Sequence, residues 1–146
     1  MIGAAGGCDH RMCLMTTMCL IGEADPFLAR LLERFGSASG LTVVWAKVGQ
    51  ELLNLAQALR PDIIVVDPEL PGTLRGWEAV RAIGADSGLA HVPVLTCSWL
   101  SEADALALTG DADGHLQKPD LHYEDFVAAL ARVGLYRSWQ DSPTPV

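Results

Sequence analysis

Short apolar runs of strand length alternate along this chain with segments whose apolar residues recur at helical spacing. The alternation starts near residue 18 and repeats five times. Such a pattern is typical of βαβ units, in which parallel strands are joined by crossover helices. The third apolar run, residues 63–66, contains only Ile and Val, as expected for a central strand that is covered on both faces. The sequence therefore predicts an α/β domain built on a five-stranded parallel sheet.

The limits of the elements follow from the apolar spacing and from capping signals. Asp25 and Pro26 are a typical helix start, because Asp caps the first turn and Pro suits the first helical position. A turn is expected over residues 36–40, GSASG. We predict strands at residues 18–22, 41–46, 63–66, 94–97 and 114–117, and helices at residues 26–35, 50–59, 77–85, 101–108 and 123–133. Residues 1–17 are predicted to be a disordered leader, residues 18–135 the folded domain, and residues 136–146 a tail.

The charge and hydropathy of the chain exclude several classes of function. With 10 Lys and Arg against 18 Asp and Glu, its net charge is −8, the wrong sign for binding nucleic-acid phosphates. The apolar runs all fall short of the roughly 18 residues that a membrane span requires. Asp9, His10 and Arg11 interrupt the region where a signal peptide would be apolar. We therefore expect a soluble cytoplasmic protein without direct contact to nucleic acid or membrane.

Polar side chains follow four of the predicted strands. Glu23 and Asp25 come after the first strand, Asp67 after the third, Ser98 after the fourth and Lys118 after the fifth. In an open parallel α/β sheet, ligands bind beyond the carboxyl ends of the strands, at the point where the strand order reverses. A single sheet would place all five residues on that edge, which makes them the candidate functional residues.

The stretches DIIVVDPELPG, PVLTCS and GDADGHLQKP resemble the receiver domain of bacterial two-component response regulators, and the resemblance extends over residues 18–133. It implies a flavodoxin-like, doubly wound sheet with strand order 2-1-3-4-5. In that family the acid after the third strand accepts a phosphoryl group from a histidine kinase, and Asp67 holds the matching position. Ser98 matches the family's hydroxyl residue, which meets a phosphoryl oxygen. Lys118, followed by Pro119, matches the lysine that pairs with the phosphoaspartate.

The resemblance also implies a Mg²⁺ cofactor. Transfer to a carboxylate brings two negative groups together, so alignment and charge neutralisation dominate the catalysis. Glu23, Asp67 and the backbone carbonyl of Glu69 are the implied ligands. Asp25 is a further candidate ligand, but we favour its competing role as a helix cap.

Three residues depart from the family's pattern. Ala24 stands where the family has a carboxylate that binds the metal directly, so we expect Mg²⁺ to bind weakly. Trp99 replaces a small residue after Ser98, where an indole would narrow access to Asp67 and slow transfer. His115 replaces an aromatic residue that turns inward on activation. It is either a weaker, pH-sensitive switch or a partly exposed histidine without such a role, and we favour the second.

Three functions compete. The first is a single-domain receiver, itself not an enzyme, that is phosphorylated on Asp67 by a sensor histidine kinase or phosphotransfer protein. It would signal by contact with a downstream protein, and a homodimer would form through the fourth helix, fifth strand and fifth helix. The second is a pseudo-receiver, a binding module regulated without phosphate, which Ala24 and Trp99 favour. The third is an aspartyl-nucleophile phosphatase of the haloacid dehalogenase type, in which Glu69 would have to replace a second aspartate.

Overall fold

The computed structural model of the protein describes residues 17–110 and 112–135. Apart from Thr17, the leader and tail predicted from the sequence lie outside the described residues. Strands and helices alternate through the whole described part. The strands are β2 (Met18–Gly22), β3 (Thr42–Ala46), β4 (Ile63–Val66), β5 (Val94–Ser98) and β6 (Gly114–Gln117). The helices are α2 (Pro26–Ala38), α3 (Gly49–Leu59), α4 (Gly76–Ala85), α5 (Glu102–Thr109) and α6 (Tyr123–Arg132).

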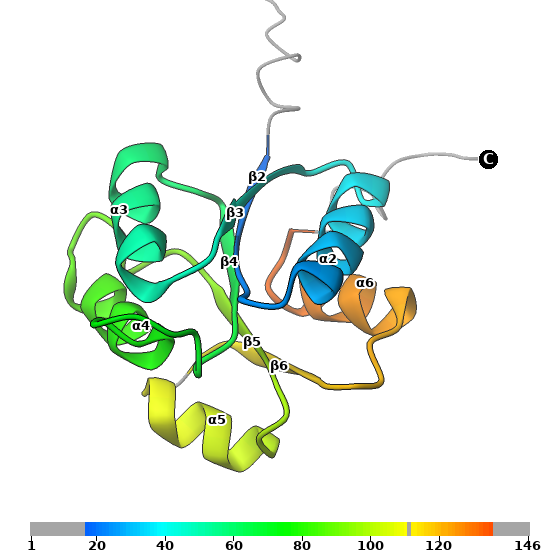
Figure 1. Ribbon diagram of the computed structural model, residues 1–146. Helices are drawn as coiled ribbons and strands as arrows, with labels where there is room; N and C mark the ends of the chain where they lie inside the picture. The colour runs from blue at the N-terminus through cyan, green and yellow to red at the C-terminus, as the bar shows by residue number, and fades with distance from the viewer. Residues whose placement is uncertain (1–16, 111, 136–146) are drawn as a thin grey trace, which may run out of the picture.

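The five strands form one parallel sheet in the order β3-β2-β4-β5-β6. Numbered by their order in the chain, this is 2-1-3-4-5, and the predicted doubly wound fold is confirmed. Helices α2 and α6 cover one face of the sheet, while α3 and α4 cover the other (Figure 1). Helix α5 lies beside β6 and α4, near the edge of the sheet.

Two apolar layers hold the helices on the sheet, because successive side chains of a strand point to opposite faces. Ile64 and Val66 of β4 pack with α3 and α4, whereas Ile63 and Val65 pack with α2 and α6. All four side chains are fully buried. Burying an aliphatic side chain of this size contributes about 1.5 to 3 kcal/mol. The burial of β4 on both faces therefore explains why residues 63–66 are all apolar.

The turn predicted over residues 36–40 was wrong in part, because α2 continues through Gly36 to Ala38. A Cβ atom at Gly36 would lie 2.7 Å from Cγ2 of Val43, so this glycine allows α2 to approach β3 closely. The chain reverses instead at Gly40, whose φ of 84° lies in the left-handed region that glycine favours. The other predicted limits agree with the observed ones to within one residue. In the described ranges, 17–110 and 112–135, we find no helix that is long and apolar enough to cross a membrane.

The loop that follows β4 folds back against the start of α4, and Gly76 allows this close contact. A Cβ atom at Gly76 would lie 2.3 Å from the backbone oxygen of Asp67 and 2.8 Å from Cβ of Leu70. The Gly76 N–H donates to Leu70 O at 2.9 Å, and the Trp77 N–H donates to Pro68 O at 3.0 Å. The position of Asp67 therefore depends on a glycine at position 76.

We expect Gly76→Ala to lower the free energy of unfolding by about 1 to 3 kcal/mol, since the added methyl group must displace backbone atoms. Gly84, in the same helix, is the matched control because a Cβ atom there would meet nothing within 4 Å. Gly84→Ala should raise stability by about 0.5 to 1 kcal/mol through the better helix propensity of alanine. Urea denaturation of both variants measures the difference. Equal effects would contradict the close packing at Gly76.

Candidate functional site

The carboxyl ends of four neighbouring strands bring the candidate residues to one edge of the sheet. Glu23 directly follows β2, Asp67 directly follows β4, Ser98 ends β5, and Lys118 directly follows β6. Strand β4 lies between β2 and β5, which places Asp67 in the middle of the group. The edge expected from the sequence therefore exists.

Glu23, Asp67 and Lys118 form a buried cluster of two acids and one base. The Lys118 ammonium nitrogen lies 2.7 Å from Oδ2 of Asp67 and 2.9 Å from Oε1 of Glu23. The exposed fraction is 4% for Lys118, 2% for Glu23 and 9% for Asp67. Charged groups are rarely buried to this extent unless they are paired. Lys118 is the cation that makes the burial of both carboxylates tolerable.

The pKa values of Glu23 and Lys118 are both raised in this cluster. Burial raises the pKa of Glu23, and the hydrogen bonds and charge of Lys118 offset this only partly. Burial alone would lower the pKa of Lys118, but hydrogen bonds and charges from Asp67 and Glu23 outweigh it and raise that pKa. Lys118 is thus held as a cation, while Glu23 is the carboxyl that takes up a proton more readily than usual.

Backbone groups hold both carboxylates in place. The Glu69 N–H donates to Oδ1 of Asp67 at 2.8 Å, and the Asp25 N–H donates to Oε2 of Glu23 at 3.1 Å. The indole N–H of Trp45 donates to the backbone oxygen of Glu23 at 2.7 Å. The sequence analysis missed this role of Trp45. The residue is the last but one of β3, next to β2, but nothing in its local pattern indicates where the indole points.

Asp25 caps helix α2, as we favoured from the sequence. Its Oδ1 accepts a hydrogen bond from the Phe27 N–H at 2.9 Å, and its backbone is extended, as N-cap residues are. Ser98 is fully buried, and its Oγ accepts from the Leu100 N–H at 2.9 Å. In the described part of the chain, no hydrogen bond joins Ser98 Oγ to the cluster. The Ser98 hydroxyl therefore shares the edge with the cluster without a hydrogen bond to it.

The carboxylate oxygens of Glu23 and Asp67 are ligands of the kind that Mg²⁺ prefers. Mg²⁺ is bound through one or two carboxylates, with waters and phosphate oxygens as its other ligands. Oε1 of Glu23 is buried and lies 2.9 Å from the ammonium nitrogen of Lys118. Among the described residues, this oxygen accepts no hydrogen bond of good geometry. Groups of three or more His, Cys, Asp or Glu side chains arranged for a metal are absent from residues 17–110 and 112–135. Two carboxylates at one edge of the sheet fit a magnesium site of few protein ligands.

The two other departures noted in the sequence differ in their surroundings. Trp99 is 62% exposed, so most of its indole faces solvent. His115 is half-buried, and both of its ring nitrogens have partners: Nδ1 lies 2.7 Å from Thr96 Oγ1, and Nε2 lies 3.0 Å from Gln117 Oε1. The sequence analysis did not identify Gln117, because a single polar residue at a strand end is no signal by itself.

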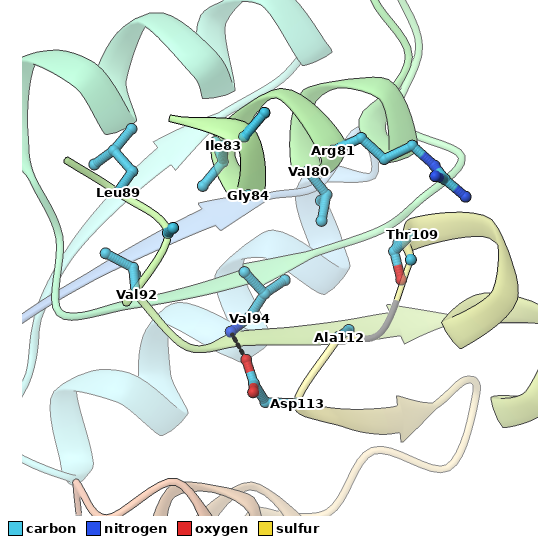
Figure 2. Close-up of a pocket in the computed structure, with 13 residues that line it drawn as sticks. Val80, Arg81, Ile83, Gly84, Leu89, Val92, Val94, Thr109, Ala112 and Asp113 are labelled. Carbon is cyan, nitrogen blue, oxygen red and sulfur yellow. Dashed lines mark hydrogen bonds between the residues drawn. The ribbon is translucent and has the colours of Figure 1, made fainter. Parts of the chain in front are cut away.

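A cavity of about 470 Å³ lies between α4 and α5, but away from the cluster (Figure 2). Its walls include Val94 and Asp113 at the beginnings of β5 and β6, which is the opposite edge of the sheet. Oδ2 of Asp113 accepts from the Val94 N–H at 2.8 Å, drawn as the dashed line in Figure 2. This cavity therefore does not coincide with the candidate functional site.

Comparisons with known proteins agree with this fold. A family model described as the response regulator receiver domain matches residues 19–131. The polar-differentiation response regulator DivK of Brucella ovis is 30% identical over 99 residues, covering 68% of this chain and 75% of DivK. The receiver domain of sensor histidine kinase PA1611 from Pseudomonas aeruginosa, with magnesium coordinated in the active site cleft, superposes with a TM-score of 0.71 at 24% identity. That match covers 82% of this chain and 98% of the other.

A further relative belongs to a larger protein. Protein-glutamate methylesterase/protein-glutamine glutaminase 4 of Myxococcus xanthus is 34% identical over 143 residues, which cover 86% of this chain. The chain spans only 39% of the length of that protein. Because the family model covers most of the chain and most of DivK is matched, the chain belongs to the response regulator receiver domain family.

Proposed function

We propose that this receiver domain accepts a phosphoryl group on Asp67 and signals by contact with other proteins. The observation that supports this most is the ammonium of Lys118, which lies within 2.9 Å of both buried carboxylates. Receiver domains as a family interact with histidine kinases or phosphotransfer proteins. We infer that such a protein, in the cytoplasm, is the phosphodonor here.

In the transfer, an oxygen of the Asp67 carboxylate bonds to phosphorus while the bond between phosphorus and the donor's histidine nitrogen breaks. The product is an acyl phosphate on Asp67, and the histidine keeps the electron pair of the broken bond. The main obstacle is repulsion between the carboxylate and the phosphoryl oxygens. Lys118 lowers that repulsion because its charge already lies 2.7 Å from Asp67. The Glu69 N–H holds the other Asp67 oxygen, which limits rotation of the carboxylate.

Members of this family bind Mg²⁺ in the acidic site, and PA1611 is an example. In this chain Glu23, Asp67 and the backbone carbonyl of Glu69 would hold the ion. When bound, Mg²⁺ supplies further positive charge to the transferring group. Ala24 has no side-chain oxygen, so we propose a site weaker than those with two adjacent acids.

Ser98 is proposed to respond to the phosphorylated state. Its hydroxyl accepts from the Leu100 N–H, which leaves its own hydrogen free to donate to a phosphoryl oxygen. A shift of Ser98 toward the phosphoryl group would then move the loop that joins β5 to α5. The surface of α5, β6 and α6 is where we expect a downstream protein or a second copy to bind.

Ala24 favours the second candidate, a pseudo-receiver that binds partners without phosphorylation. Glu69 stands where a phosphatase of the haloacid dehalogenase type has its second aspartate, and its backbone rather than its side chain contacts Asp67. We therefore rank the phosphatase last. The methylesterase activity named for the Myxococcus relative is not proposed for this chain, which spans 39% of that protein.

The deciding experiment is incubation with acetyl phosphate and Mg²⁺, followed by intact-mass measurement. We expect an adduct with the mass of one phosphoryl group on the wild type and none on Asp67→Ala. Asp62→Ala is a control that removes an exposed aspartate of the same segment. If the wild type remains unmodified at high Mg²⁺ while a known receiver is labelled, the pseudo-receiver becomes the better description.

A further inference from the structure

The amide of Gln117 links the end of β5, at Ser98, to Lys118, which directly follows β6. Its Nε2 lies 3.2 Å from each of three backbone oxygens, those of Ser98, Trp99 and Lys118. We propose that Gln117 is a positioning residue for the candidate site, and that the Nε2–H of His115 holds its amide in the required orientation. Only the part of this inference that concerns phosphorylation rests on the proposed function of Asp67.

The three backbone oxygens determine which way the amide of Gln117 points. Nε2 has two hydrogens to donate, whereas Oε1 can only accept. The opposite orientation would place Oε1 against three carbonyl oxygens with no hydrogen between them. In the observed orientation Oε1 lies 3.0 Å from Nε2 of His115. Because Oε1 is an acceptor, Nε2 of His115 must carry a hydrogen.

The other ring nitrogen of His115 meets a hydroxyl that has only one hydrogen. Oγ1 of the fully buried Thr96 lies 3.2 Å from the backbone oxygen of Gly114 and 2.7 Å from Nδ1 of His115. A neutral His115 with its hydrogen on Nε2 needs the Thr96 hydrogen at Nδ1, which leaves Gly114 O without it. When both ring nitrogens carry hydrogen, Thr96 donates to Gly114 O and accepts from Nδ1. In both forms, Nε2 of His115 carries the hydrogen that Oε1 of Gln117 accepts.

The consequence for the site follows from the backbone bonds around Ser98. The Lys118 N–H donates to Ser98 O at 2.8 Å, and Gln117 adds a second donor to the same oxygen. The Leu100 N–H is bonded to Ser98 Oγ. Gln117 therefore fixes the start of the β5–α5 loop relative to Lys118.

The test compares Gln117→Met, which keeps the length of the side chain but has no amide, with the wild type. Gln50→Met is the matched control, since Gln50 is an exposed glutamine whose amide bonds only to Asn54 among the described residues. The first measurement is amide hydrogen exchange at Lys118 and Leu100, corrected for intrinsic rates. We expect protection to fall about fivefold in Gln117→Met, the change that corresponds to one lost hydrogen bond. Gln50→Met should match the wild type.

Nitrogen NMR of the His115 ring is the second measurement. We expect the neutral ring to be the Nε2–H tautomer. His115→Phe is a second variant, which should lose the protection at Lys118. An Nδ1–H tautomer in the neutral ring, or equal protection in Gln117→Met and the wild type, would overturn the proposal.

Neither measurement requires a phosphodonor, so each separates this inference from the proposed function. If the wild type is labelled by acetyl phosphate, Gln117→Met should be labelled about tenfold more slowly, since small displacements of aligned groups are costly in rate. If exchange and tautomer behave as expected but Asp67 is never labelled, the network stands and the phosphoacceptor function fails. Labelling at the wild-type rate in Gln117→Met would show that the amide does not position the site.

Discussion

Replacing Lys118 with methionine is expected to lower the free energy of unfolding by about 3 to 5 kcal/mol at neutral pH. The substitution removes the only cation that contacts Glu23 and Asp67 among the described residues and leaves two buried carboxylates uncompensated. Losing one partner of a buried ion pair is far more damaging than losing an exposed pair. Chemical denaturation of the two proteins at the same pH measures the difference.

The effect of Lys118→Met should shrink as the pH falls. Burial raises the pKa of Glu23 in the fold above its value in the unfolded chain, which is about 4.3 for glutamate. Ionised Glu23 therefore costs stability above its folded pKa, and that cost disappears as the pH falls toward the unfolded value. The raised pKa of Lys118 means that its contribution is fully present below about pH 10.4 and is lost only above its folded pKa. The difference between the two proteins is thus largest near neutrality and smaller near pH 4.

Lys47→Met is the matched control for this prediction. Lys47 is exposed and lies over the ring of Trp45, with its ammonium 5.0 Å from the ring centre. A contact of this kind at an exposed site contributes about 0.5 to 1 kcal/mol. If Lys118→Met were no more destabilising than Lys47→Met, the carboxylates would not depend on Lys118 for their burial.

Restoring a carboxylate at position 24 should strengthen Mg²⁺ binding by about 10- to 100-fold. Residues that only hydrogen-bond to the ligands of a metal site change its affinity by about 10- to 100-fold. A direct ligand should contribute at least as much. Ala24 is exposed and lies between Glu23 and Asp25, so Ala24→Asp introduces the oxygen without repacking the core. Magnesium titrations followed by the amide chemical shifts of residues 23–25 give the dissociation constants.

Two controls decide why the affinity changes. Ala24→Asn has nearly the same size as Ala24→Asp but no charge, and it should bind Mg²⁺ much more weakly. Asp25→Ser keeps an oxygen for the helix cap while removing the carboxylate. A lower affinity in Asp25→Ser would show that Asp25 compensates for Ala24. An unchanged affinity in Ala24→Asp would refute the view that position 24 limits the site.

The order of elements was predictable because it depends on local periodicity. The run at residues 63–66 became the buried strand β4, and Asp25 became the cap of α2, as expected. Both outcomes follow from forces that act within a few residues, namely alternate burial along a strand and the unpaired N–H groups of a first helical turn. Gly36 shows the limit of such inference. Its local signal indicates a turn, but Gly36 lies within α2, where the lack of a Cβ atom lets the helix approach Val43 of β3.

The sequence by itself determined the parallel sheet and placed Glu23, Asp67, Ser98 and Lys118 at its carboxyl edge. That inference works because strand direction alone brings residues after successive strands to the same side. Only the tertiary structure decided which side chains touch: the Lys118 ammonium contacts Glu23 and Asp67, while the Ser98 hydroxyl bonds to the nearby Leu100 N–H. Contacts that cross between elements, such as those of Trp45 and Gln117, have no sequence period and arise only when the strands are packed in register.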